Sequence, residues 1–292
     1  MKKSKSEWVY DAIIYTIVTL FALACIIPFM YVVTFSITPY QDYLREPANI
    51  LPRNPTFAAY DRVLRMPLIY SGYRSTLFIT LIGTALNLFM LSVSAYPLTK
   101  KHLKGQSIIL PFIIFTMFFN GGLIPNFYLI RSLNLYDSLW ALMLPGALST
   151  WNLIMMMNFF RQLPDSLEES AIIDGANEII VLFKILLPLS LPAIATFALF
   201  HAVGHWNSFF NAIIYLRTRS KWPLMLILRE MIIEDQTNIY FEGFQDFEAA
   251  RLINPFNIKM AVIVVSIFPI LVVYPFLQRF FMKGLLVGSI KG

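Results

Sequence analysis

Long stretches without charge alternate with short charged segments along this chain of 292 residues. Six of the stretches contain no Asp, Glu, Lys or Arg and are long enough to cross a bilayer, which takes about 20 mainly apolar residues. After trimming, they predict membrane-spanning helices at 13–36, 75–99, 106–130, 138–160, 187–212 and 260–278. The pattern therefore predicts an all-α polytopic membrane protein, built as one transmembrane domain over residues 1–292.

The composition agrees with this prediction. Hydrophobic residues make up 58% of the chain and charged residues only 14%, whereas soluble chains carry roughly 25% charged residues. A soluble protein with a large core is the weaker interpretation. The net charge of +6 does not indicate nucleic-acid binding, because many of the basic residues flank apolar stretches. Cys25 is the single cysteine, so we expect it to be a small packing residue without a disulfide.

The distribution of basic residues predicts the orientation, because Lys and Arg are enriched in short cytoplasmic loops. They gather at the two ends of the chain and between the second and third spans. These residues are Lys2, Lys3, Lys5, Lys100, Lys101, Lys104, Arg279, Lys283 and Lys291. Both termini and the loop 161–184 are then cytoplasmic, and the long polar loops 38–74 and 217–259 face outward.

Prolines and glycines interrupt several of the predicted spans. Asn120-Gly121-Gly122 breaks the third span, and Pro188 and Pro192 lie at the start of the fifth. Broken backbone is tolerated inside a bilayer where it is buried in protein or lines a cavity. The breaks favour a bundle around a pathway, although ordinary proline kinks in a packed bundle give the same pattern.

The cytoplasmic loop 161–184 is acidic and amphipathic. Pro164-Asp165-Ser166 predicts a helix start with Asp165 or Ser166 as N-cap, and Gly175 allows a left-handed turn where that helix ends. A second helix follows from Ile179, and Pro188 marks its junction with the fifth span. The result is a helix–turn–helix with an acidic tip that lies across the membrane face. An interfacial helix covering lipid is the alternative, but such helices are usually rich in Lys and Arg.

This loop resembles a known motif. Glu169-Ser170-Ala171, then Asp174-Gly175-Ala176, and Ile185 to Pro188 are similar to the EAA loop of bacterial ABC importer permeases, with Ser170 in place of the second alanine. The predicted spans resemble the smaller permease of the carbohydrate-uptake group, similar to the second subunit of the maltose permease. The segment from Trp206 to Asn211 is most similar to complex-oligosaccharide permeases of the lipoprotein-associated and alginate type.

The resemblance implies an ATP-driven, binding-protein-dependent oligosaccharide importer that works by alternating access in the bacterial inner membrane. The implied ATPase-coupling residues are Glu169, Ser170, Ala171, Asp174, Gly175, Ala176, Ile185 and Pro188. Glu169 is expected to pair with a basic residue of the ATPase, and Gly175 to bend the loop. The implied partners are a second permease in a heterodimer, a dimeric cytoplasmic ATPase, an extracytoplasmic solute-binding protein, the oligosaccharide and membrane lipid, but no nucleic acid.

The chain itself contains no Gly-x-x-x-x-Gly-Lys-Ser/Thr, so ATP and Mg²⁺ are expected on the ATPase. We therefore expect no cofactor on this chain, and no enzyme activity.

Polar side chains inside spans are costly, so they are candidates for a substrate pathway. The candidates are Asn120, Asn158, His205, Trp206, Asn207 and Asn211. An indole suits the apolar face of a pyranose and an amide suits its hydroxyls, while hydrogen bonding between helices is the alternative role. His201 and His205 are one turn apart, but no third ligand is evident, so we predict no metal site.

Two other functions have to be weighed. An ion-coupled secondary transporter often has an ionisable residue inside a span, and none of the six stretches has one. An integral-membrane enzyme needs a nucleophile with a base, or a metal site, and neither is visible. An acidic cytoplasmic loop would also be unexplained in such an enzyme.

Overall fold

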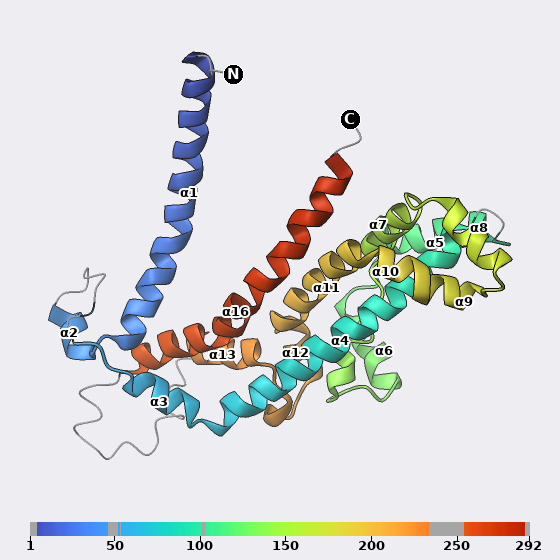
Figure 1. Ribbon diagram of the computed structural model, residues 1–292. Helices are drawn as coiled ribbons and strands as arrows, with labels where there is room; N and C mark the ends of the chain where they lie inside the picture. Colours follow the sequence, from blue (N-terminus) through green and yellow to red (C-terminus); the bar gives the residue numbers. More distant parts are fainter. Residues whose placement is uncertain (1–4, 46–51, 53, 101–102, 234–253, 290–292) are drawn as a thin grey trace. The chain divides into compact units, whose positions relative to one another are not determined.

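The computed structural model describes all residues except 1–4, 46–51, 53, 101–102, 234–253 and 290–292 (Figure 1). Within the described residues the chain is helical and has no strand, which confirms the predicted all-α class. The long elements are α1 (Lys5–Ile37), α4 (Pro67–Thr99) and α16 (Pro255–Ser289). The shorter ones are α2 (Tyr40–Arg45), α3 (Ala58–Leu64), α5 (Gln106–Phe118), α6 (Leu123–Ser132), η1 (Leu139–Leu142), α7 (Thr150–Phe160), α8 (Asp165–Ile173), α9 (Glu178–Ile180), η2 (Val181–Leu186), α10 (Leu187–Leu189), α11 (Leu191–Trp206), α12 (Phe210–Tyr215), η3 (Arg219–Lys221) and α13 (Leu224–Ile233).

The chain divides into two compact units. One unit comprises residues 1–66 and 230–268, and the other comprises 67–229 and 269–292. In the first unit the end of α1 is tied to the start of α16 by Asn257, whose amide donates to the carbonyls of Phe35 at 2.7 Å and Thr38 at 2.8 Å. Because a buried amide without partners is costly, these bonds hold the first turn of α16 against α1.

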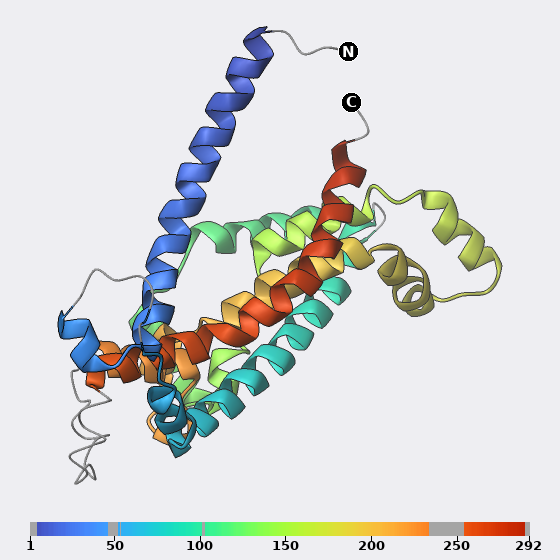
Figure 2. The ribbon, with the colours of Figure 1, turned by 60° about the vertical axis from the view of Figure 1, so that its left-hand side comes forward.

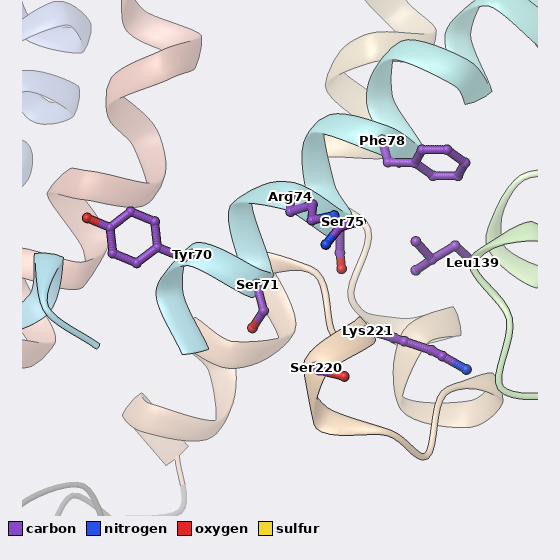
Figure 3. A pocket seen from close by; sticks show the side chains of 8 residues that line it. All are labelled: Tyr70, Ser71, Arg74, Ser75, Phe78, Leu139, Ser220 and Lys221. Atoms are coloured by element: carbon purple, nitrogen blue, oxygen red, sulfur yellow. The ribbon is translucent and has the colours of Figure 1, made fainter. Parts of the chain in front are cut away.

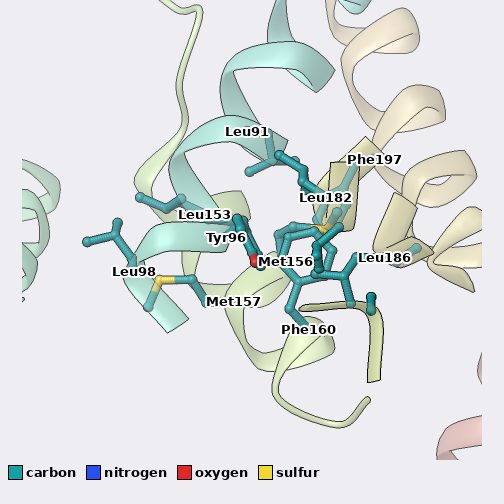
Figure 4. Close-up of a cluster of buried hydrophobic side chains, with 14 residues drawn as sticks. Leu91, Tyr96, Leu98, Leu153, Met156, Met157, Phe160, Leu182, Leu186 and Phe197 are labelled. Carbon is teal, nitrogen blue, oxygen red and sulfur yellow. The ribbon is translucent and has the colours of Figure 1, made fainter. Parts of the chain in front are cut away.

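The second unit is built around α4. Helices α11 and α7 pack along α4, and their apolar side chains form one buried core with the turn η2 (Figure 4). Leu91 and Tyr96 of α4 meet Met156 and Phe160 of α7 in this core, together with Leu186 of η2. A second core surrounds Ile79, nearer the start of α4, with residues of η1 and α12. The view in Figure 2 shows α8 and α9 projecting beyond α7 and α11 as a separate loop.

The lengths of the helices bear on the predicted spans. Three segments are long and apolar enough to cross a membrane: Glu7–Ile37, Pro67–Thr99 and Pro255–Pro275. Two further candidates are bent pairs, Gln106–Phe118 with Leu123–Ser132 at 118° and Glu178–Leu189 with Leu191–Trp206 at 83°. The described residues thus give three candidate spans, or up to five if each bent pair counts as one, and the count of six stays a prediction.

Several spans differ from their predicted form, and residues 187–212 are divided among α10, α11 and α12. Helix α4 begins at Pro67, well before residue 75, because its first turns are held by protein contacts as well as by apolar character. Residues 138–160 form η1 and α7 with a non-helical segment between them, not one helix. Pro145 and Gly146 lie in this segment, where proline removes a backbone donor and glycine weakens helical order.

The predicted break at Asn120-Gly121-Gly122 is confirmed. Helix α5 ends at Phe118 and α6 begins at Leu123. Gly122 has φ 88° and ψ 177°, a conformation that only glycine adopts readily. The Asn120 side chain accepts a hydrogen bond from the Gly122 N–H at 2.9 Å, so Asn120 stabilises the break itself.

Candidate functional site

The loop between α7 and α11 has the predicted helix–turn–helix form. Helix α8 ends at Ile173, and Gly175 then adopts φ +88°. The Ala176 N–H donates to the Ala171 carbonyl at 2.9 Å, and the Gly175 N–H donates to the Ile172 carbonyl at 3.0 Å. This is the hydrogen-bond pattern of a glycine-terminated helix. The second arm starts where the Asn177 side chain accepts from the Ile180 N–H at 2.9 Å.

Two details of the predicted loop are wrong. The N-cap of α8 is Pro164, and neither Asp165 nor Ser166 caps the helix, because proline holds residue 164 extended and the helix begins directly after it. The second arm also continues past Pro188 to Leu189, and the bend falls at Ser190. The widened π-turn η2 precedes Pro188, whose nitrogen has no hydrogen to donate to the preceding turn.

Both arms of the loop are attached to α4 by four side chains, which we call the Tyr96 cluster: Tyr96, Lys100, Glu168 and Glu178. The Tyr96 hydroxyl lies 3.0 Å from a carboxylate oxygen of Glu168 on α8 and also hydrogen-bonds Glu178 on α9. Lys100 forms an ion pair with Glu168, and its ammonium lies 4.4 Å from the centre of the Tyr96 ring. Part of the acidic excess of the loop is therefore neutralised within this chain.

Sequence reasoning missed Tyr96 and assigned Lys100 only to the orientation. A signal was present, because a phenol and an ammonium four residues apart at the end of a span lie on one helix face. What the sequence could not give was their partners, which lie 72 and 82 residues away from Tyr96.

The remaining acidic residues of the loop are exposed. Glu169 and Asp174 make no side-chain hydrogen bond or ion pair with any residue that the structure describes. Between them Ile173 is 85% exposed. Glu169 and Asp174 are therefore available to pair with another protein, and Ile173 offers apolar area between them.

The other predicted coupling residues have two kinds of environment. Ala171 is buried and Ala176 and Ile185 are partly buried against the core of Figure 4, so they fix the loop to the helices. Ser170, Gly175 and Pro188 are exposed.

A second polar group lies deeper in the same unit, where the histidines of α11 face asparagines on neighbouring helices. His205 Nε2 lies 2.6 Å from Asn87 Oδ1 on α4. Asn87 Nδ2 donates to the carbonyls of Gly146 at 2.8 Å and Ala147 at 2.9 Å. Since that amide nitrogen already donates twice, Oδ1 is the acceptor and His205 carries the proton on Nε2.

The neighbouring histidine also faces an asparagine, but here the amide donates, with Asn152 Nδ2 lying 3.2 Å from His201 Nε2. Gly83 makes room for His205, because a Cβ at that position would lie 2.6 Å from His205 Nε2. These contacts favour the alternative role for His205, hydrogen bonding between helices. Asn87 and Gly83 were missed, although their spacing of four residues within an uncharged span is a visible signal.

The remaining pathway candidates do not gather at one place. Trp206 is buried, with its ring centre 6.4 Å from that of Tyr73. Asn207 donates to the Val203 carbonyl at 3.0 Å and so closes the end of α11. Asn158 is exposed on α7, whereas exposed Asn211 precedes the buried Ala212 of the core around Ile79. The described residues also contain no group of three or more His, Cys, Asp or Glu that could hold a metal.

At the opposite end of α4 from the Tyr96 cluster, Asp137 organises the segment 217–221. Its carboxylate accepts from the N–H groups of Arg217 at 3.0 Å and Thr218 at 2.9 Å and from the Thr218 hydroxyl at 2.6 Å. Lys221 Nζ lies 3.0 Å from Oδ2, the same oxygen that accepts from the Thr218 hydroxyl. Partial burial raises the pKa of Asp137, but the hydrogen bonds from Thr218, Lys221 and Arg217 outweigh it and hold the pKa well below its ordinary value.

An all-helical membrane subunit with broken spans and an acidic, glycine-turned loop is the arrangement of an ABC importer permease. No family model matches the chain. Individual proteins do, however. The polygalacturonan/rhamnogalacturonan transport system permease protein YtcP of Bacillus subtilis (strain 168) is 42% identical over 287 residues, which cover 97% of this chain and 98% of that protein. Protein LplC of the same organism is 46% identical over 268 residues, 91% of this chain and 90% of LplC.

The structure has a solved counterpart. A chain in the crystal structure of a bacterial ABC transporter involved in the import of the acidic polysaccharide alginate matches with a TM-score of 0.89 at 33% identity. The match covers 96% of this chain and 99% of that one. The chain belongs to the permease subunits of binding-protein-dependent ABC importers of the carbohydrate-uptake group, and it is of the second-subunit type.

This membership confirms the resemblance drawn from the loop motif. The chain is a multi-pass permease of the inner membrane, and ATP hydrolysis takes place on a partner subunit. The two competing functions, an ion-coupled secondary transporter and an integral-membrane enzyme, are thereby excluded.

Proposed function

We propose that the chain forms one half of a permease heterodimer that imports oligosaccharides by alternating access. Its partners are a different permease subunit, a dimeric cytoplasmic ATPase that carries ATP and Mg²⁺, and an extracytoplasmic solute-binding protein. The observation that carries the proposal is the division of the acidic loop residues. Glu168 is neutralised by Lys100, and Glu178 is within hydrogen-bond reach of the Tyr96 hydroxyl, whereas Glu169 is exposed and has no partner among the described residues.

The ATPase contact follows from that division. Glu169 pairs with a basic residue in a groove of the ATPase, and the exposed Ile173 fills an apolar part of the same groove. The tight turn at Gly175 sets the angle between the two arms, with Asp174 and Ala176 supporting it. When ATP brings the ATPase halves together, the loop moves with them. The Tyr96 cluster passes this motion to α4, which supplies the differential contact that an alternating-access equilibrium needs.

The proposed topology has six spans with both termini in the cytoplasm. The grouping of loops around α4 supports it. The Tyr96 cluster joins one end of α4 to the loop 161–184. The segments that the orientation rule assigns to the outside, near Leu139 and at 217–221, meet at the other end. The middle of the second outer loop, including the acidic residues from Glu234 to Glu248, lies outside the described residues.

The proposed substrate class is an oligosaccharide that contains uronic acids. Polygalacturonan is a polymer of a uronic acid, and YtcP is the permease protein of a polygalacturonan/rhamnogalacturonan transport system. The solved transporter imports an acidic polysaccharide, alginate. Trp206, Asn207, Asn211 and Asn158 remain our candidates for contact with the sugar inside the membrane, whereas Asn120 serves the helix break and His205 serves packing between helices.

Purification of the assembled complex tests the coupling. We expect Glu169→Ala to reduce co-purification of the ATPase and to abolish the stimulation of ATP hydrolysis by loaded binding protein. Asp165→Asn is the matched control, because Asp165 is another exposed acid of α8 outside the motif. If Glu169→Ala and Gly175→Pro both leave ATPase association and uptake intact, the proposed coupling role of the loop is wrong.

A further inference from the structure

A pocket of about 640 Å³ lies at the start of α4, at the end of the helix away from the Tyr96 cluster (Figure 3). Its volume is within the range of about 300–1,000 Å³ that is typical of small-molecule sites. The first turns of α4 form one wall, and η3 and Leu139 form the other. All of these segments belong to the same compact unit.

The helical wall of the pocket follows from residue spacing. Tyr70, Arg74 and Phe78 are spaced four residues apart and therefore lie on one face of α4. Ser71 and Ser75 follow on the adjoining rows of the same face. Figure 3 shows the Ser71 and Ser75 hydroxyls and the Arg74 guanidinium bordering the same space. A cation, hydroxyls and aromatic rings are thus presented together.

The charge of the pocket is positive. Its lining contains Arg74 and Lys221 and no carboxylate. Lys221 is shared with Asp137, whose carboxylate oxygen lies 3.0 Å from the ammonium. Arg74 is exposed and makes no hydrogen bond or ion pair with any described residue. The uncompensated charge in the pocket is therefore the guanidinium of Arg74.

We propose that this pocket is an entry subsite that recognises the carboxylate of a uronic-acid residue before the oligosaccharide passes into the membrane. The inference rests on the proposed function and adds a site to it. A guanidinium binds a carboxylate through two parallel hydrogen bonds, which a single ammonium cannot match. The hydroxyls of Ser71, Ser75 and Ser220 face the sugar hydroxyls, and the ring of Phe78 covers an apolar sugar face.

The position of Lys221 adds rigidity to this site. Because Asp137 accepts four hydrogen bonds or ion contacts from 217–221, the wall that carries Ser220 and Lys221 is held in place before a ligand arrives. A preformed wall loses little freedom on binding, which favours recognition of a small charged group.

The test compares matched substrates on the assembled complex in nanodiscs with its binding protein. The probes are oligogalacturonides and alginate oligosaccharides, each beside its carboxyl-reduced, neutral counterpart. Stimulated ATP hydrolysis gives KM and kcat for each. We expect Arg74→Gln to raise KM for the acidic probes at least tenfold, to leave kcat unchanged and to leave the neutral probes unaffected. Arg74→Lys should fall between Arg74→Gln and the unmodified protein. Arg131→Gln, at another exposed arginine without a described partner, is the control and should change neither parameter.

Other outcomes overturn the proposal. If Arg74→Gln affects acidic and neutral probes equally, or has no effect, the pocket does not recognise the carboxylate of the substrate. Weaker docking of sugar-free binding protein to Arg74→Gln assigns the pocket to an acidic side chain of that protein instead. Stimulation of the unmodified complex by neutral probes alone refutes the substrate class as well as the subsite. If ATP hydrolysis does not respond to any loaded binding protein, the proposed function itself fails.

Discussion

The role of the Tyr96 hydroxyl in coupling can be tested by a substitution that removes a single oxygen atom. Tyr96→Phe keeps the aromatic ring, which is 5% exposed and packs in the core of Figure 4, and removes only the group that reaches Glu168 and Glu178. The substitution therefore separates attachment of the loop from packing of α4. It also leaves the ion pair of Lys100 with Glu168 in place.

The free energy lost in Tyr96→Phe follows from the number of hydrogen bonds that the hydroxyl can donate. A phenol has one proton, so it donates to one of the two carboxylates at a time. A hydrogen bond to a charged group contributes about 1.5–3 kcal/mol. The Glu168 side chain is 19% exposed, so water compensates part of the loss and the lower end of the range applies. A free energy of about 1.5 kcal/mol corresponds to a roughly tenfold increase in the equilibrium constant for release of the loop.

Hydrogen exchange of the assembled complex without nucleotide measures this release. We expect the amides of α8 to exchange about tenfold faster in Tyr96→Phe and those of α11 to be unchanged. Stimulation of ATP hydrolysis by loaded binding protein should fall while basal hydrolysis is retained, because the ATPase stays bound through Glu169. Tyr128→Phe is the control, since that tyrosine is 64% exposed and its hydroxyl has no described partner. Unchanged exchange in α8 together with full stimulation would refute the role of the cluster.

Three further predictions concern the turn at Gly175, the buried Asn87 and the segment 217–221. Gly175→Ala should destabilise the turn by about 1–2 kcal/mol through its left-handed backbone alone, since a Cβ there meets nothing within 4 Å, and should reduce the stimulation of ATP hydrolysis. Gly175→Asn should recover part of that stimulation, because asparagine tolerates the left-handed conformation. Asn87→Ala should lower the thermal unfolding temperature, because it leaves two carbonyls and His205 without their partner at about 1–3 kcal/mol each, whereas Asn158→Ala should leave it unchanged. Since the pKa of Asp137 is lowered in the folded protein, its carboxylate holds 217–221 fully above the ordinary pKa near 3.9, and this stabilisation is lost as the pH falls from there through the lower pKa of the folded state. The rate of protease cleavage at 217–221 should therefore be constant from about pH 5 to 8 and rise only below about pH 4. A rise near pH 6 would contradict this assignment.

Much of the architecture could be predicted from local signals. The absence of charge over 20 or more residues predicted helices in the membrane, and the glycines at 122 and 175 predicted the break and the turn, because each position requires a backbone that other residues avoid. Helix continuity was less predictable. Residues 138–160 are uncharged, yet Pro145 and Gly146 separate η1 from α7. An uncharged stretch is compatible with lipid, but the lack of charge does not show that the stretch forms one continuous helix.

The contacts at the two polar groups could not be predicted, because they join residues far apart in the chain. Asn87 meets a histidine 118 residues away, and Tyr96 meets two glutamates from different helices. Periodicity assigns a side chain to a face of its own helix but does not say which helix packs on that face. The same limit explains His205, whose polarity suggested a pathway and whose geometry serves packing between α4 and α11.

Helix α4 connects the features that the function requires. It spans 33 residues, or about 50 Å at 1.5 Å per residue, and carries the Tyr96 cluster near one end and the Arg74 pocket near the other. Between them Asn87 and Gly83 lock it to α11 and to the carbonyls at 146–147. Because α4 is a continuous helix held near its middle by these contacts, a displacement of one end also moves the other end, and no separate rearrangements are needed in between. Loss of the Asn87 hydrogen bonds should therefore reduce coupling more than substitutions of side chains on the exposed face of α4.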